Sequence, residues 1–109
     1  MRLLKKEEID LISHLLKQVP NCDHFLQKLA DLQVEEMKDG KMGSLKFIPK
    51  ISKKQTMKAE IARIDTLTDF DGVLLSITLN LSTDNELYEL DIFKGDFSPL
   101  KQFPLPPYE

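Results

Sequence analysis

Residues 69–100, DFDGVLLSITLNLSTDNELYELDIFKGDFSPL, decide the fold of this chain. Within residues 73–82 every odd position is apolar, and every even position after Leu74 is polar. Such strict alternation predicts a β-strand with one face in the core and the other in water or against a polar layer. Residues 83–85, Thr-Asp-Asn, favour a tight turn, and alternation resumes over residues 86–94. The stretch therefore predicts two long antiparallel strands at the centre of a sheet.

The length and composition are typical of one soluble domain. The chain has 109 residues, 41% of them hydrophobic and 30% charged, enough for a single core. No apolar run approaches the ~20 residues that cross a bilayer, and charges interrupt the opening MRLLKKEEID, so we expect no signal peptide and no membrane binding. The single cysteine excludes an internal disulfide. We therefore expect a cytoplasmic protein.

The charges are distributed unevenly along the chain. Residues 38–63 carry eight Lys or Arg and two acids, whereas residues 64–109 carry nine acids and two lysines. Such asymmetry can mark a surface for a partner. It can equally reflect neighbouring strands of opposite sign that attract one another. The sequence leaves both interpretations open.

Two helices are expected before the sheet. Over residues 7–19, apolar side chains recur at three- and four-residue steps, and Pro20 ends the pattern. Asn21 or Asp23 can cap a second helix, at about residues 22–32. The short connection predicts a helical hairpin packed on one face of the sheet.

Turn residues and short alternating segments predict the other strands. Asp39-Gly40 is a strong hairpin signal, and the basic segment 50–55 is expected to be an exposed loop. The pattern slips at residues 62–64, which indicates a β-bulge. Residues 95–109 contain four prolines and predict an extended tail along the domain. The fold class is therefore α+β over residues 1–109, with four or five mostly antiparallel strands, at about residues 34–37, 44–48, 56–65, 73–82 and 86–94.

The segment DFDGVL, residues 69–74, looks like the first motif of the haloacid dehalogenase-type phosphatases. In that motif the first Asp is a phosphoryl-accepting nucleophile that ends a buried apolar strand and precedes a helical region. Here the preceding residues are polar and a strand follows at once. The remaining phosphatase motifs cannot fit after Gly72 either. We therefore interpret the segment as a β-turn at an Asp-Gly pair.

Carboxylates form the main candidate site. Paired carboxylates can bind a divalent cation or perform acid–base chemistry. No loop has the ligand spacing of a calcium site, so we expect no metal and no cofactor. Two interpretations remain, a solvated sheet face and an acidic surface that docks a basic partner. The candidate residues are Asp69, Asp71, Glu89, Asp91 and Asp96.

Two further features concern surfaces. Leu87 and Phe93, like Leu74, fall on the face opposite the expected core, and they would form an exposed apolar patch or lie under the tail. An exposed patch would favour a partner or a homodimer. The lysines of residues 50–58 lack interleaved aromatic residues and the whole chain is acidic, so we expect no nucleic-acid binding.

Three segments together resemble an uncharacterised family of small bacterial proteins, a domain of unknown function. They are the opening residues 2–8, the turn DGKMGSL at residues 39–45, and the C-terminal pieces that include LYELDIFKGDFSPL at residues 87–100. Family members usually have Gly where Lys41 stands and an indole where Phe93 stands. The resemblance spans nearly the whole chain and implies no established activity.

From the sequence we expect a non-catalytic bacterial protein-interaction module. Its sharpest version is an immunity-protein role, by analogy with small acidic bacterial proteins that accompany secreted toxins. The alternative is a metal- or small-ligand-binding protein or enzyme that uses the carboxylates around the central hairpin. That alternative predicts a pocket in which Asp69, Asp71, Glu89 and Asp91 converge with raised pKa values.

Overall fold

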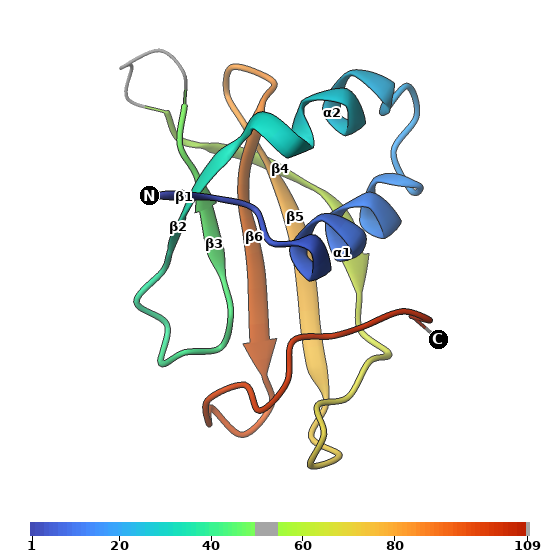
Figure 1. The fold of residues 1–109 in the computed structure, drawn as a ribbon, viewed down its shortest axis with the longest axis vertical. Helices are drawn as coiled ribbons and strands as arrows, with labels where there is room; N and C mark the ends of the chain where they lie inside the picture. Colours follow the sequence, from blue (N-terminus) through green and yellow to red (C-terminus); the bar gives the residue numbers. More distant parts are fainter. Residues whose placement is uncertain (50–54, 109) are drawn as a thin grey trace.

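A computed structural model describes residues 1–49 and 55–108 (Figure 1). Most of the exposed loop expected at residues 50–55 lies outside the described residues. Six strands and two helices, the second continued by a 3₁₀ turn, follow one another along the chain. Their bounds are β1 Arg2–Leu3, α1 Lys6–Leu16, α2 Asp23–Lys28, η1 Leu29–Asp31, β2 Gln33–Glu36, β3 Leu45–Phe47, β4 Met57–Ile64, β5 Leu75–Ser82 and β6 Leu87–Lys94.

The strands form one antiparallel sheet in the order β1-β2-β3-β6-β5-β4. The predicted central hairpin is confirmed, because β5 and β6 pair along almost their whole lengths. The α+β class is confirmed too, but the sheet has six strands rather than four or five. The strand that the sequence analysis missed is β1, whose two residues pair with Val34 and Gln33. Two residues are too short for an alternation signal.

Both helices and the C-terminal tail lie on the same side of the sheet (Figure 1). Helix α1 supplies the main apolar face, with Leu11, Ile12, Leu15 and Leu16 fully buried. They pack against the inward side chains of the strands in one core. The predicted helical hairpin is wrong in detail, because α2 is only six residues long and all of its residues are at least partly exposed. The second helix therefore adds little to the core.

An ion pair joins β1 to the start of α1. The Arg2 guanidinium donates to both carboxylate oxygens of Glu8, at 2.7 and 2.8 Å. The backbone N–H of Lys5 donates to the same carboxylate at 2.7 Å. Burial alone would raise the pKa of Glu8, but these donors outweigh it and hold that pKa below its usual value. Glu8 thus fixes the first strand to the first helical turn.

The predicted inward side of β5 is confirmed for three residues, but burial does not alternate along the strand. Thr78, Asn80 and Ser82 are buried too, and Leu81 is only partly buried. Leu75, Ile77 and Leu79 point into the core and have almost no exposed surface. On the opposite face, which no helix covers in Figure 1, polar residues of neighbouring strands lie side by side. Asn80 pairs there with Glu60 and Glu89. We call this open face of β3, β6, β5 and β4 the outer face.

Three register shifts interrupt the pairing of the described strands, the first of them between Met57 and Ala59 in β4. In β4 the register shifts between Glu60 and Ala62, which confirms the predicted bulge slightly earlier than expected. In β6 the pairing with β5 passes from Glu89 to Leu87, and Tyr88 between them is opposite no residue of β5. Leu87 therefore turns into the core and is 7% exposed. Its predicted place in an exposed apolar patch is wrong.

The tail after β6 runs along the domain on the helix side, as predicted (Figure 1). Leu100 and Phe103 pack against the core, and the Tyr108 ring lies 4.9 Å from that of His14 in α1. Within the described residues, no helix is both long and apolar enough to cross a membrane.

Candidate functional site

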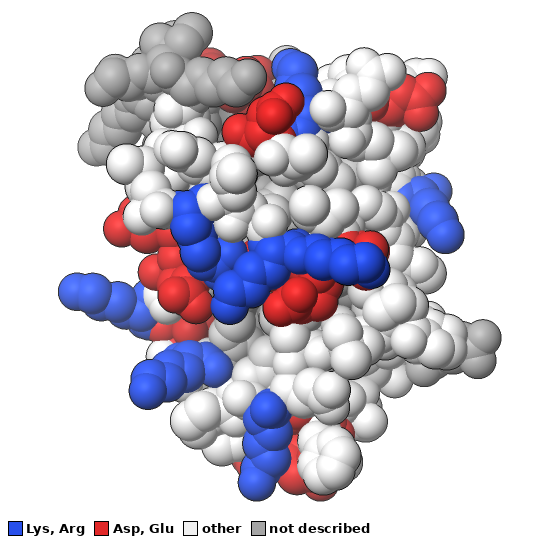
Figure 2. Space-filling view, in the orientation of Figure 1, with Lys and Arg blue, Asp and Glu red and all other residues white. Residues whose placement is uncertain are grey.

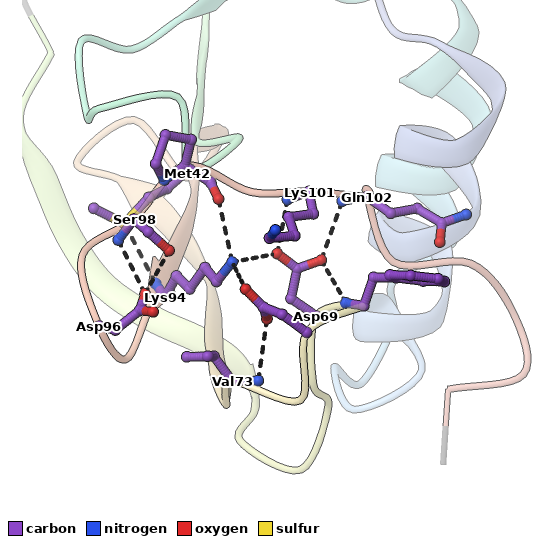
Figure 3. A network of polar contacts seen from close by, with 11 residues as sticks. Met42, Asp69, Val73, Lys94, Asp96, Ser98, Lys101 and Gln102 are labelled. Atoms are coloured by element: carbon purple, nitrogen blue, oxygen red, sulfur yellow. Dashed lines mark hydrogen bonds and ion pairs between the residues drawn. The ribbon is translucent and has the colours of Figure 1, made fainter.

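Three segments far apart in the sequence meet where β6 ends. They are the loop of residues 39–44, the turn of residues 69–74, and residues 94–102 at the start of the tail (Figure 3). We call this region the clamped end. Two of the segments that carry the family resemblance meet here, the DGKMGSL turn and the end of LYELDIFKGDFSPL, whereas the opening residues 2–8 lie elsewhere, in β1 and the start of α1.

Lys94 is the centre of the clamped end (Figure 3). Its ammonium lies 2.7 Å from a carboxylate oxygen of Asp69 and 2.7 Å from one of Asp71. It also donates to the backbone carbonyl of Pro99 at 3.2 Å. The side chains of Lys94 and Asp69 have no exposed surface, and that of Asp71 is 24% exposed. Three acceptors match the three N–H donors of an ammonium, so Lys94 has no donor left for a ligand.

Asp69 is the most strongly bound carboxylate. Besides Lys94, it accepts backbone N–H groups of Lys101 at 2.7 Å, Phe70 at 2.7 Å and Gln102 at 3.1 Å. Burial alone would raise the pKa of Asp69, but the Lys101 N–H, the Lys94 ammonium and the other two N–H groups lower it to about 2. Two of these donors belong to the tail. Asp69 therefore holds both the end of β6 and the tail.

The charges of this triad reinforce one another. Burial alone would lower the pKa of Lys94, but the two carboxylates raise it above its usual value. Lys94 lowers the pKa of Asp71. All three groups are therefore ionised at neutral pH. Because two carboxylates face one ammonium, the triad carries a net charge of −1.

The loop of residues 39–44 forms the other wall of the clamped end. Asp39 accepts the backbone N–H groups of Met42 and Ser44, at 3.1 and 3.0 Å. Gly43 has φ +98°, and a Cβ there would lie 3.1 Å from Leu100 and 3.3 Å from Ile92. The glycine is needed both for this backbone conformation and for the close approach of the tail.

Two other contacts tie the loop to its neighbours. The Ser44 hydroxyl accepts the backbone N–H of Ile92 at 2.8 Å, which joins the loop to β6. The backbone carbonyl of Lys41 accepts the N–H of Leu100 at 3.0 Å. Lys41 has φ +64°, a left-handed conformation that favours glycine. This agrees with the glycine that the resembling family has at this position.

The five carboxylates predicted as a site do not converge. Asp69 and Asp71 bind Lys94. Glu89 accepts the side-chain amide of Asn80 on the outer face, at 3.2 Å. Asp91 is on the outer face too, exposed and 3.2 Å from the Ser44 hydroxyl.

Asp96 lies in the turn after β6, where it accepts the N–H and hydroxyl of Ser98, at 3.0 and 2.6 Å. The pKa values of Asp69, Asp71 and Asp96 are lowered rather than raised. Within residues 1–49 and 55–108, no group of His, Cys, Asp and Glu is arranged to hold a metal ion.

Large apolar side chains are exposed around the clamped end. Phe93 is 41% exposed on the outer face, and its ring makes an edge-to-face contact with that of Phe97, with ring centres 5.0 Å apart. The backbone N–H of Gly95 donates to the carbonyl of Leu74, which places the two segments side by side. Leu74, Phe70, Phe97 and Leu105 are all more than half exposed. We call Phe93, Phe97 and Leu74 the apolar patch. Phe70 and Leu105 line a hollow beside the clamped end.

The described residues include the linings of two small hollows. One, beside the clamped end, is lined by Phe70, Phe103 and Leu105 and has about 210 Å³ of free volume. The other, between α2 and the ends of β3 and β6, has about 60 Å³. Both are smaller than the ~300–1,000 Å³ of a typical small-molecule site.

Sequence reasoning missed Lys94, although a signal for it was present. Lys94 continues the inward series of Leu90 and Ile92 in β6. A lysine at an inward position needs carboxylate partners, because a buried unpaired charge is very unfavourable. The Asp-Phe-Asp-Gly turn supplies them. The motif that looked like a phosphatase nucleophile is a turn, as predicted, and binds this lysine.

Comparison with known proteins agrees with this pattern. No curated protein and no solved structure matches the chain. One family model does match, and it covers residues 1–104, which include all three segments of the clamped end. The chain therefore belongs to the family described as a domain of unknown function, DUF6984.

Proposed function

We propose that this protein is a non-catalytic interaction module that binds a basic protein partner through the clamped end and the adjoining outer face. The observation that carries the proposal is the apolar patch, which stands on a rigid scaffold rather than on loose loops. Apolar patches of this kind on a soluble domain favour a protein-interaction site. Aromatic residues are also enriched in protein interfaces.

Charge around the patch favours a basic partner. Residues 65–74 and 91–105, which form this end, contain five aspartates and two lysines. Lys94 is one of the two, and the aspartates bound to it leave the triad negative. Asp91 and Asp96 are exposed beside the aromatic pair. On the helix side, Figure 2 shows acidic and basic residues mixed over much of the surface.

The chemistry of the triad supports a binding role over a catalytic one. A general acid or base works best when its pKa is near the operating pH and when the group is free to exchange a proton with the substrate. Asp69 has a pKa of about 2, and the donors of Lys94 are all used within the protein. The triad thus resembles a structural ion pair. We still predict that the protein binds neither nucleic acid nor a membrane, and that it is cytoplasmic.

An immunity-protein role is the sharpest form of this proposal. Such a protein would bind a basic toxin domain tightly, and surface carboxylates would steer the two together. Charge steering is screened by salt, so association would slow as ionic strength rises.

The test is an affinity pull-down from the protein's own cell lysate at about 0.05 and 0.5 M NaCl, which spans strong and weak screening. The bait is the tagged protein, and the matched variants are Phe93→Ser at the patch and Leu26→Ser on α2, both partly exposed apolar positions. We expect a stoichiometric basic partner that is lost at high salt and lost with Phe93→Ser, but kept by Leu26→Ser.

A partner retained by Phe93→Ser, or an acidic partner, would contradict the proposal. So would the absence of a partner at both salt concentrations. In that case thermal unfolding with divalent cations would test the alternative of a metal-dependent function.

A further inference from the structure

The turn between β6 and the tail has a backbone conformation that is unusual for its sequence. Phe97 has φ +64°, in the left-handed region. Aromatic side chains are disfavoured there, and residues in such conformations cluster at functional sites. Asn21 and Asn85 adopt similar angles elsewhere in the chain, as asparagine commonly does. The conformation of Phe97 therefore calls for an explanation beyond turn formation.

Burial of the side chain does not supply that explanation, since Phe97 is 70% exposed. Its only ring partner among the described residues is Phe93, itself 41% exposed. A glycine or asparagine would form the same turn with less strain and without exposing an aromatic ring. The isolated domain thus gains little from phenylalanine at this position.

The turn is held firmly in place. The backbone N–H of Phe97 donates to the Lys94 carbonyl at 2.9 Å, and Asp96 binds both the N–H and the hydroxyl of Ser98 (Figure 3). Next to it, the Lys94 ammonium binds the carbonyl of Pro99. The ring is therefore presented in a fixed position, which reduces the conformational entropy lost on binding.

We propose that Phe97 is the anchor residue of the interface, which inserts into an apolar pocket rimmed by Lys or Arg on a different, basic protein. This inference rests on the proposed function and adds the residue and the shape of the partner's site. The acidic neighbours favour that occupant over a second copy of this chain. Two copies joined at this end would bring Asp91 and Asp96 of each close to those of the other.

The experiment places a photoreactive benzoylphenylalanine at Phe97 in the full chain, expressed in its own cells. Met57, which is 48% exposed at the start of β4 and pairs with Ser82 at the far end of β5, carries the same probe as a control. Ultraviolet light should cross-link position 97, but not position 57, to one basic protein. The captured protein is then purified, and its affinity is measured for the wild type, Phe97→Asn and Phe97→Gly.

We expect both substitutions to weaken binding at least about ten-fold, as for the loss of an interface anchor. The midpoint of urea unfolding should stay the same or rise, because Asn and Gly suit the left-handed conformation. A structural role alone would instead lower the unfolding midpoint and leave affinity in the folded protein unchanged.

Several results would overturn the anchor. They are a cross-linked dimer of this chain, an acidic partner, or equal affinity of Phe97→Asn and wild type for the partner. If the salt-sensitive partner of the pull-down binds Phe97→Asn normally, the anchor fails while the proposed function stands. If neither experiment finds a basic partner, both fail.

Discussion

Replacing Lys94 by methionine is the most severe test of the ion pairs that Lys94 makes at the clamped end. Methionine has a similar length and no charge, so the change leaves Asp69 and Asp71 facing each other without a cation. Breaking a buried ion pair by removing one partner typically costs about 3–5 kcal/mol. Because Asp71 is partly exposed, we expect about 3 kcal/mol, the lower end of that range. That is a large part of the ~5–15 kcal/mol that stabilises a typical domain.

The pH dependence provides a sharper signature. In the wild type, the folded pKa of Asp69 is about 2, below its unfolded value. Its contribution, up to about 2 kcal/mol after allowance for solvent screening, is present above pH ~4 and is lost as pH falls toward 2. In Lys94→Met the unpaired carboxylates repel each other, which raises their folded pKa values. The variant should therefore become more stable as pH falls from 7 to 5, a range over which the Asp69 contribution of the wild type stays constant.

Urea unfolding followed by far-ultraviolet circular dichroism, from pH 7 to 3, measures both effects. The chain has no tryptophan, so tyrosine fluorescence is the second probe. Lys58→Met, which removes an exposed lysine bonded to Asn85, is the control and should follow the wild-type curve. A loss under ~1 kcal/mol at pH 7, with a pH profile parallel to the wild type, would refute a buried Lys94 clamp.

Other substitutions test the rest of the structure by the same urea unfolding. Leu79→Ala should cost ~2–5 kcal/mol, and a loss under ~1 would mean that the inward face of β5 is misassigned. Leu87→Ala should cost about 2–4 kcal/mol, whereas Phe93→Ala should cost under ~1; the reverse order would refute the bulge in β6. Gly43→Ala should cost about 1–3 kcal/mol and speed amide hydrogen exchange in the tail; normal exchange would contradict the tight contact. Lys41→Gly should stabilise by up to about 1 kcal/mol, and a loss would show that φ +64° is not strained there.

The fold could be predicted where the local pattern of apolar and polar residues in a segment indicates which of its side chains are buried. In β5, Leu75, Ile77 and Leu79 alternate with polar residues and lie in the core, although Thr78 and Asn80 between them are buried as well. That local pattern is sufficient to predict the strand and its orientation. The short strand β1 has no such pattern, because its place depends on Val34 and Glu8, which lie elsewhere in the chain.

The orientation of Leu87 shows where alternation fails. A period of two assumes that every residue of β6 pairs in turn, but the bulge at Tyr88 shifts the phase by one residue. Leu87 therefore faces the core while Phe93, beyond the bulge, stays on the outer face as predicted. The sequence around Tyr88 contains no glycine or proline that would have indicated the irregularity.

The candidate site was predictable in its residue types but not in its pairing. The sequence analysis named Asp69 and Asp71 as candidate site residues in an Asp-Phe-Asp-Gly turn. It cannot show that the tail returns to donate the N–H groups of Lys101 and Gln102 to Asp69. Those bonds depend on the path of the tail in three dimensions. The left-handed conformation of Phe97 could not be predicted either, because the residue type alone does not determine φ.

The central claim is that the clamped end is a fixed ionised network and not an acid–base site. The most direct test is a pH titration by NMR that follows the carboxyl carbon of Asp69 and the ammonium signal of Lys94. We predict a pKa of about 2 for Asp69 and a Lys94 that stays charged well above neutral pH. An Asp69 that titrates near 4 or higher, or a Lys94 that loses its proton near pH 7, would contradict the account and restore catalysis as the better explanation.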